Sequence, residues 1–378
     1  MDILSGIWNY VIPFLAVLTM LVFVHEMGHY LVARWCKVRI QVFSIGFGPE
    51  IYGIDDKHGT RWKFSAIPFG GYVKMFGEQP PDEMDPDGHQ PMTEEDRKVS
   101  FFCKTLGQRA AIVFAGPAAN FLFAIVVLAG LFSLVGQPYT PPDIGKVIEN
   151  SAAARAGLKD GDVFKRIGDT EITRFEQVQR IVQLSPGQPL KIVVARDGRL
   201  QNVTATPDGV EVKRFGSIQR IGQLGVTRPT GDMVLVRYDP FTALWKATER
   251  TASLTVDIFD ALGQIITGQR TAEELGGPVR IAQISGDMAQ AGLVMVIQFA
   301  AILSINLGLI NLFPIPMLDG GHLVFYGIEA IRGRPLGERA MGYSLNVGLA
   351  LIFGLTVFVT WNDLVQLRVI DYFIGLVT

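Results

Sequence analysis

Long apolar stretches alternate with polar segments along this chain of 378 residues. The first stretch, residues 7–24, holds no charged residue. As a helix rising about 1.5 Å per residue it would span roughly 27 Å, close to the thickness of a bilayer core. Three further apolar stretches fall within residues 107–136, 289–322 and 344–378. The pattern predicts a polytopic α-helical membrane protein with four transmembrane helices, the first of which lies within residues 1–37.

Residues 38–76 show a different pattern, rich in aromatic residues, β-branched residues and glycine, with a turn signal at His58-Gly59. Such alternation predicts short strands, so we expect a membrane-associated β-hairpin region here. Apolar β structure beside a membrane helix must be buried in protein or line a cavity. A strand edge of this region could pair with an extended substrate, or the segment could be a small packing hairpin. The residue pattern alone favours neither.

Positive charge at the ends of the apolar stretches predicts which side of the membrane each end faces. Residues 77–106, which include an acidic and proline-rich stretch, and residues 323–343 are expected to be cytoplasmic loops. Both termini are then expected outside the cytoplasm. The charges that carry this prediction are Arg34, Lys37, Arg39, Lys98, Lys104, Arg109, Arg332, Arg334 and Arg339.

The polar middle of the chain, residues 137–230, is predicted to be an extracytoplasmic α+β domain. A strand at 144–148, a short helix at 151–158, a strand at 163–167 and an amphipathic helix at 173–184 follow one another, and a strand at 190–196 comes next. This order resembles the circularly permuted PDZ domains of membrane and envelope proteases. Residues 231–288 carry charges spaced to leave an apolar face, which predicts amphipathic helices on the membrane surface or against the PDZ-like domain.

Composition and charge exclude some classes of protein. The 49% hydrophobic content is near that of globular chains, so its distribution rather than its amount indicates a membrane protein. The net charge of -2 gives no reason to expect nucleic acid as a partner. Cys36 and Cys103 lie in segments predicted to be cytoplasmic, so no disulfide is expected. The first helix lacks the basic start and the cleavage site of a signal peptide, and we expect it to be retained.

The candidate chemistry lies at the end of the first apolar stretch, in the sequence His25-Glu26-Met27-Gly28-His29. On a helix, His25 and His29 lie on one face, one turn apart. This HExxH spacing suits two imidazoles that bind one zinc ion, with Glu26 as the general base that activates water. Ionisable groups within a membrane helix are costly, so we interpret the motif as functional rather than as packing.

The third metal ligand is expected near the end of the third apolar stretch. Two prolines, Pro314 and Pro316, interrupt helix there, and Asp319 follows them. Two histidines and a carboxylate form a catalytic rather than a structural zinc set. Asp319 could instead cap the following helix, and His322 is a less favoured alternative ligand.

Other polar residues near the motifs have simpler interpretations. Asn120, in the second apolar stretch, could support the metal site, although we favour an interhelical hydrogen bond. His58 and His89 are interpreted as solvated loop residues.

Five segments together resemble one family: HEMGH, FGGYVKM, the PDZ-like stretch, GGPVRIAQ and NLFPIPMLDGGH, in this order. They are similar to the site-2 protease family of intramembrane zinc metalloproteases, and most to its bacterial branch of the regulator of sigma-E protease type. The resemblance implies that His25, His29 and Asp319 bind zinc and that Glu26 activates water. It also implies that Asn311, assisted by Asn306, holds the substrate backbone, with Pro314 and Pro316 shaping the loop. The FSIGFG and FGGYVKM segments resemble the family's membrane-associated β region, which favours pairing with substrate.

We therefore expect an intramembrane metalloprotease with one zinc ion per chain, in a bacterial inner membrane, with its metal site in the cytoplasmic half of the bilayer. The resemblance implies substrates that are transmembrane proteins, such as anti-sigma factors or remnant signal peptides, cut second in regulated intramembrane proteolysis. A peptide C-terminus could bind the PDZ domain, or this domain could act as a spacer or size filter. The best-known member has two PDZ domains, whereas this chain has room for one.

Two alternative functions belong to other classes. A catalytically inactive, membrane-anchored PDZ adaptor would bind membrane substrates without cutting them. A zinc peptidase tethered to the membrane surface would cut soluble peptides, but its metal motif would not be expected within an uncharged span.

Overall fold

The computed structural model describes residues 6–78, 93–214, 217–227, 234–268, 276–334 and 336–366. The chain divides into two compact units. The first comprises Met1–Gly130, Thr242–Asp260 and Leu275–Thr378, and the second comprises Leu131–Phe241 and Ala261–Glu274. The predicted loop residue His89, most of the acidic loop and the C-terminal tail lie outside the described residues.

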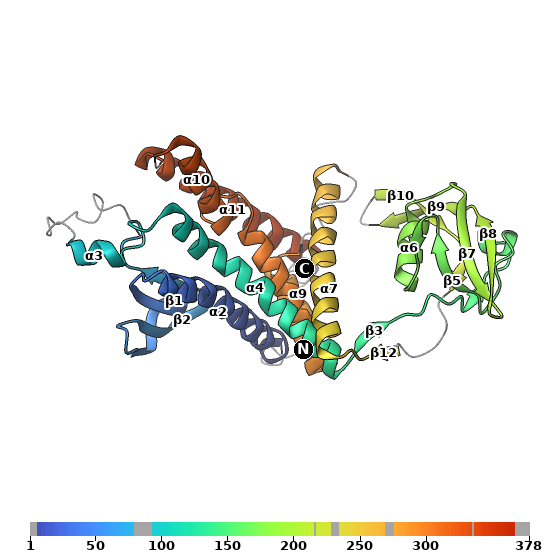
Figure 1. Cartoon of the computed structure of the whole chain (residues 1–378), viewed down its shortest axis with the longest axis horizontal. Helices are drawn as coiled ribbons and strands as arrows, with labels where there is room; N and C mark the ends of the chain where they lie inside the picture. Colours follow the sequence, from blue (N-terminus) through green and yellow to red (C-terminus); the bar gives the residue numbers. More distant parts are fainter. Residues whose placement is uncertain are drawn as a thin grey trace, which may run out of the picture. The chain divides into compact units, whose positions relative to one another are not determined.

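The first unit is mainly helical, and its long helices run side by side (Figure 1). Four helices among the described residues are long and apolar enough to cross a membrane: Trp8–Trp35, Leu106–Leu134, Leu293–Asn311 and Arg339–Val365. The remaining helices are shorter or more polar. The helices in chain order are η1 (Ile7–Val11), α2 (Ile12–Trp35), α3 (Glu94–Val99), α4 (Leu106–Leu134), α7 (Pro240–Ile266), α8 (Pro278–Ala291), α9 (Leu293–Asn311), α10 (Asp319–Arg332) and α11 (Glu338–Gln366), of which α4 and α7 extend into the second unit.

Helix α2 presents one buried stripe to the rest of the unit. Its buried residues recur every three or four positions, as expected of a helix with one face toward a core. His25 and His29 belong to this stripe, whereas Leu31 and Trp35 on other faces are exposed. The fold therefore turns the histidine pair of the HExxH motif inward, toward α4 and α9.

The predicted β region is present as strands β1 (Ile40–Asp55) and β2 (Arg61–Met75). The turn between them is held by Asp56, whose carboxylate accepts hydrogen bonds from the backbone N–H groups of His58 and Thr60. Burial would raise the pKa of Asp56, but these bonds and those from Trp62 and Tyr30 lower it to about 2.

The hairpin is bent, so residues 42–45 of β1 form a middle strand with a neighbour on each side. Residues 42–45 of β1 pair on one side with residues 71–74 of β2 and on the other side with residues 61–64. Phe43 of this middle strand is buried against Phe23 and Tyr30 of α2. The segment 71–75 consequently forms an edge of the sheet, and it lies along α2.

The chain after α9 differs from the prediction in its helix boundaries. Helix α9 ends at Asn311, a short irregular loop follows, and α10 begins at Asp319. The prediction of a loop over residues 323–343 is wrong, because α10 continues to Arg332 and α11 begins at Glu338. Gly333 ends α10 in the left-handed conformation, at a φ of 69°, that glycine adopts readily. One face of α10, with His322, Phe325 and Tyr326, lines the cavity described below, whereas Ile331 is exposed.

The segment predicted as amphipathic surface helices also contains a buried contact. Helix α8 packs beside η1, and the carboxylate of Asp363 in α11 accepts hydrogen bonds from the backbone N–H groups of Gly277 and Arg280. Asp363 is 1% exposed. A residue distant in sequence thus satisfies the free N–H groups at the start of α8.

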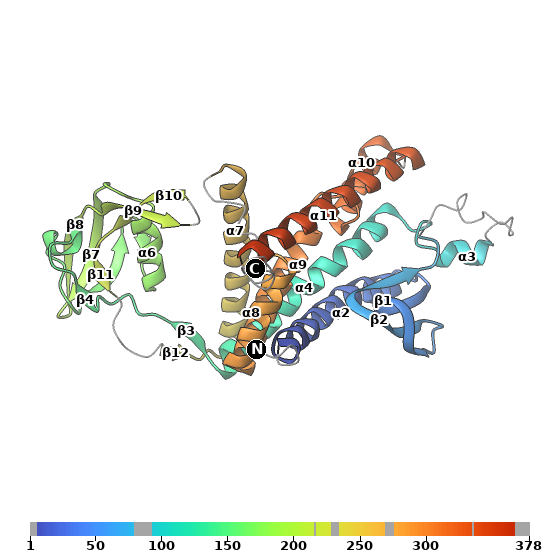
Figure 2. The ribbon, with the colours of Figure 1, turned by 180° about the vertical axis from the view of Figure 1, so that it is seen from behind.

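The second unit is a small α+β fold with antiparallel sheets, seen from two sides in Figures 1 and 2. Its main sheet has the strand order β6-β5-β7-β8, and α6 packs on it with Phe175 and Val178 in the core. The helices and strands predicted between residues 144 and 196 are present. The elements of this unit are β3 (Gln137–Tyr139), β4 (Lys146–Val147), α5 (Ala152–Arg155), β5 (Val163–Ile167), β6 (Thr170–Glu171), α6 (Phe175–Gln183), β7 (Leu190–Arg196), β8 (Arg199–Ala205), β9 (Asp208–Arg214), β10 (Ser217–Gln223), β11 (Val226–Thr227) and β12 (Val234–Val236).

A buried ion pair fixes the turn before β5. Asp162 has no exposed surface, and it accepts two hydrogen bonds of 2.7 Å from Arg196 and one of 2.9 Å from the backbone N–H of Lys159. Burial would raise the pKa of Asp162, but these donors outweigh that effect and hold the pKa below its usual range.

Candidate metal centre

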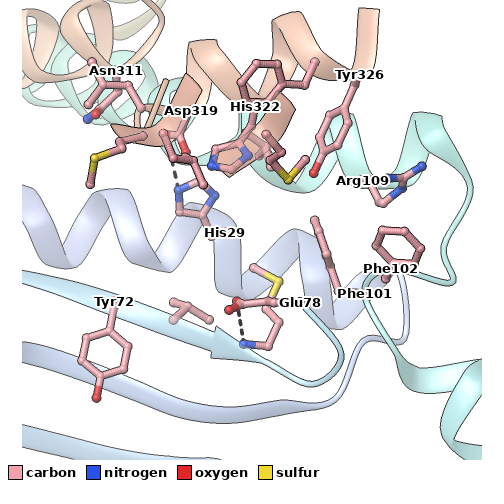
Figure 3. Close-up of a pocket in the computed structure, with 18 of the residues that line it drawn as sticks. His29, Tyr72, Glu78, Phe101, Phe102, Arg109, Asn311, Asp319, His322 and Tyr326 are labelled. Atoms are coloured by element: carbon pink, nitrogen blue, oxygen red, sulfur yellow. Dashed lines mark hydrogen bonds and ion pairs between the residues drawn. The ribbon is translucent and has the colours of Figure 1, made fainter. Parts of the chain in front are cut away.

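Three potential metal ligands from two distant parts of the chain meet between α2 and the start of α10. The Nε2 atoms of His25 and His29 are 3.2 Å apart. The Oδ2 atom of Asp319 lies 3.1 Å from Nε2 of His25 and 3.5 Å from Nε2 of His29. Figure 3 shows Asp319 beside His29. Both histidines are less than 10% exposed. The sequence-predicted ligand set is thus brought together in space.

The spacing of these three atoms fits a zinc ion. Donors at about 2.0–2.2 Å from a tetrahedral ion lie roughly 3.3–3.6 Å from each other, close to the separations found here. The Oδ2 atom of Asp319 is buried and has no hydrogen-bond partner among the described residues. His29 directs its other ring nitrogen, Nδ1, to the backbone carbonyl of Ile112 at 2.9 Å. A proton on Nδ1 leaves the Nε2 lone pair free for an ion, as metal-binding histidines require.

Asp319 does not take the alternative role of a helix cap. It is the first residue of α10, and its carboxylate points to the imidazole pair. The residue at the cap position, Leu318, makes no capping hydrogen bond with its side chain.

Asn120 of α4 lies directly behind the site. Its side-chain Nδ2 is 3.0 Å from Nδ1 of His25, and its Oδ1 atom is buried without a hydrogen-bond partner in the described part of the chain. The nitrogen and oxygen of an amide are assigned from their hydrogen bonds. If Nε2 of His25 binds a metal, Nδ1 of the same ring carries a proton and donates a hydrogen bond. When the Asn120 amide is rotated by 180°, its Oδ1 atom, which otherwise has no partner, accepts that hydrogen bond. The contact is a hydrogen bond between α4 and α2, as favoured from the sequence, and because its partner is His25 it also supports the metal site.

This arrangement makes a prediction for zinc affinity. Asn120→Leu keeps the branched shape but removes the acceptor, and we expect it to weaken zinc binding about 10–100-fold. Asn120→Asp keeps an acceptor for the His25 proton, so its zinc affinity should stay near that of the wild type. Competition with a chelator of known affinity measures both variants. Equal zinc affinity of the leucine variant and the wild type would show that Asn120 only packs.

A cavity of about 710 Å³ opens beside the three ligands. Glu26 lines it together with His25 and His29, so its carboxylate shares the space in which a bound peptide would lie. Figure 3 shows Tyr72 and Glu78 on the β2 side of this cavity, opposite Asp319 and His322. Both apolar and polar side chains line the wall, as in most ligand sites.

Of the four residues predicted to hold substrate or to shape the substrate loop, only Asn311 lines the cavity. Asn311 ends α9 and lines the cavity. Asn306 instead donates to the backbone carbonyl of Ile302 within its own helix, at 3.2 Å, and it does not line the cavity. Pro314 and Pro316 lie in the loop before Asp319, behind the residues that form the wall.

Met317 and His322 also line the cavity. Met317 has a φ of 83°, an unusual backbone conformation for a residue with a side chain, and it stands two positions before Asp319. The prolines predicted an irregular loop but not which residue would carry this conformation. His322 stacks edge-on with Phe325 and is not part of the three-residue ligand cluster, so its alternative role as a ligand gains no support.

Close packing of α4 against α2 leaves no room for side chains at two glycines. A Cβ atom on Gly116 would lie 2.3 Å from Nε2 of His29 and 2.9 Å from Cε1 of His25. A Cβ on Gly28 would lie 2.2 Å from the backbone oxygen of Ala115. Gly116 is therefore part of the wall that holds the histidine rings.

The fold and the site together define a membrane protein with a candidate metal centre of two imidazoles and a carboxylate set between apolar helices. Comparison with known proteins agrees with this class. The model of peptidase family M50 matches residues 13–355. The chain belongs to this family, the site-2 protease family, and is a metallopeptidase of the membrane.

Two bacterial relatives are similar along almost their whole length. A protein of Agrobacterium fabrum (strain C58), named "Putative zinc metalloprotease Atu1380", is 47% identical over 95% of this chain and 96% of its own length. A protein of Caulobacter vibrioides, named "Metalloprotease MmpA", is 37% identical over 97% of this chain and 98% of its own. The first name states zinc as the metal of that relative, and the second states only that the relative is a metalloprotease.

Proposed function

We propose that this protein is an intramembrane zinc metalloprotease that hydrolyses peptide bonds within transmembrane segments. One observation carries the proposal: His25, His29 and Asp319 converge between helices apolar enough to span a bilayer, with Glu26 on the wall of the adjoining cavity. One zinc ion per chain would be held by these three side chains.

The chemistry follows from the groups at the site. When bound, zinc lowers the pKa of water toward about 7 and polarises a carbonyl group. Glu26 is the general base: it takes a proton from the attacking water and delivers it to the leaving amine nitrogen. His29 is oriented by the carbonyl of Ile112 and His25 by Asn120, so neither ring needs to reorient during the reaction.

A transmembrane substrate must unwind before its amides become accessible, because a helix uses its carbonyl groups in internal hydrogen bonds. The edge segment 71–75 of β2 lies beside the cavity, and an extended substrate strand could pair with its backbone. Asn311 would hold the substrate backbone from the opposite wall. Glycine or proline in the substrate segment would favour local unwinding.

The topology follows from the distribution of charge. Positive residues at the ends of α2, α4, α10 and α11 support a cytoplasmic location for those ends, and we infer that the metal site lies in the cytoplasmic half of a bacterial inner membrane. Both termini and the second unit would then lie outside. We infer that this unit is a single PDZ domain that binds a peptide C-terminus or excludes substrates with bulky external domains. Such exclusion would make the enzyme the second cutter of anti-sigma factors or remnant signal peptides.

Two other functions predict different products. An inactive PDZ adaptor would bind a membrane segment and leave it intact, whereas a surface zinc peptidase would cut only outside the bilayer. The donor atoms spaced for a metal and the presence of Glu26 in the cavity favour hydrolysis over the adaptor.

The test is cleavage in liposomes by the purified full-length protein of a reporter with a single transmembrane span between two soluble domains. We expect a cut within the span, mapped by mass spectrometry, that 1,10-phenanthroline abolishes and added zinc restores. A cut found only outside the span would support the surface peptidase, and binding without cleavage would support the adaptor.

A further inference from the structure

Two backbone N–H groups of the edge segment 71–75 of β2 already have acceptors within the protein. Strand β1 pairs with one side of this segment, for example Phe43 with Val73. The backbone N–H of Met75 donates to Oε1 of Glu78 at 2.9 Å, and the backbone N–H of Val73 interacts with the carboxylate of Glu26. Two carboxylates thus already hold two alternate N–H groups of the edge.

These N–H groups are the ones that an added strand would use. Alternate residues of a strand direct their backbone groups to the same side, so Val73 and Met75 present theirs together. An incoming peptide would place its carbonyl oxygens where the Glu26 and Glu78 carboxylates now accept. Glu78 lines the same cavity as Glu26 and the histidines, so its carboxylate lies within the space open to the peptide (Figure 3).

The two carboxylates differ in what anchors them. Glu26 extends from a long helix and has a role in the proposed hydrolysis. Glu78 follows the strand by three residues, and within the described part of the chain its carboxylate forms no ion pair. Glu78 shares the cavity wall with Glu26, so a peptide that enters the cavity meets both side chains.

We propose that Glu78 is an internal competitor of the substrate at this strand edge, and that each transmembrane segment must displace it from the Met75 N–H to bind. The proposal rests on the proposed function, because it takes segment 71–75 as the surface that receives an unwound membrane segment. Glu78 then sets the affinity a segment needs in order to occupy the site. Because this competitor belongs to the protein, it weakens binding of every segment by the same factor.

The experiment uses full-length, zinc-loaded protein in detergent, with Glu26→Gln as the background so that bound peptide is not cut. The probes are two fluorescent peptides, each a leucine-rich span flanked by lysines, one with and one without a central Gly-Pro. We expect Glu78→Ala to lower the Kd of both by about five- to tenfold and by equal factors. Glu78→Gln, which keeps a weaker acceptor of the same shape, should lower it two- to threefold. Asp55→Ala, at an exposed carboxylate of the same hairpin that pairs with Arg61, is the matched control and should leave Kd unchanged.

A second readout follows the hydrogen bond itself. In protein labelled with ¹⁵N-methionine, the Met75 amide signal, assigned with Met75→Leu, should shift on Glu78→Ala, and peptide should move it back toward its original position. A role of Glu78 in protecting the strand edge from other copies of the chain predicts instead an unchanged Kd and increased self-association. That result, or a Met75 signal that peptide does not affect, would overturn the proposal.

Cleavage of the same peptides by protein with Glu26 intact is measured in parallel. If they are cut and Glu78→Ala leaves Kd unchanged, the competitor proposal fails while the proposed function stands. If the peptides bind and are never cut, the proposed function fails whatever Glu78 does.

Discussion

Glu26→Gln is expected to lower the rate of cleavage of a membrane-embedded reporter by about 10²–10⁴-fold, the range typical for loss of a general base. Glutamine has the shape of glutamate but does not accept a proton at neutral pH. His25, His29 and Asp319 are unchanged by this substitution, so zinc should stay bound. The rate is measured with purified protein, and the zinc content of the same sample is measured by mass spectrometry.

The loss should appear in kcat rather than in KM, because the proton transfer occurs only in the transition state. Glu249→Gln, which changes an exposed glutamate paired with Lys246 on α7, is the matched control and should cut at the wild-type rate. Retained cleavage by the Glu26 variant would remove this residue from the role of base. Loss of zinc from it would mean that the residue acts on the metal site instead.

Gly116→Ala is expected to abolish both zinc binding and cleavage. The added methyl group would lie 2.3 Å from Nε2 of His29, a distance that atoms do not adopt without movement. Either α4 must move away from α2 or the imidazole must turn, and displacements of about 1 Å at a reacting centre cost on the order of 10²-fold in rate. We expect less than about 0.2 zinc per chain, measured by mass spectrometry, since the three donors would no longer meet.

The control lies on the same helix. A Cβ on Gly130 would meet no atom within 4 Å, so Gly130→Ala should keep full zinc content and activity. Alanine is a better helix former than glycine by about 1 kcal/mol, and this variant should be no less stable than the wild type. Full zinc binding by the Gly116 variant would contradict the observed packing of α4 on the histidine pair.

The sequence predicted the centre well because its chemistry is local. The spacing of His25 and His29 places them on one helix face wherever that helix packs, and Ile7 to Val24 is too apolar to be a surface helix. The prolines before Asp319 marked the place where helix gives way to loop. The meeting of Asp319 with the histidines could be expected because two imidazoles alone leave a zinc site incomplete.

The roles of the residues around the metal ligands could not be predicted in this way, because these roles depend on how the helices are aligned with each other. The small residues around Gly116 predicted close helix contact, but the alignment of α4 on α2 decides that Gly116 faces His29 and that Asn120 faces His25. The resemblance gave Asn306 a role that assists Asn311, yet only Asn311 lies at the end of α9 where the cavity begins. Glu78 was part of an acidic loop in the sequence, and its bond to the strand edge depends on how β2 ends.

Zinc content of the purified full-length protein tests the central claim most directly. We predict about one zinc ion per chain in the wild type and in Asp287→Ala, which changes an exposed carboxylate on α8. Asp319→Ala removes the one ligand that does not come from α2, and this variant should retain less than about 0.1 zinc ion per chain. A wild type without stoichiometric zinc, or an Asp319 variant that keeps it, would contradict the account.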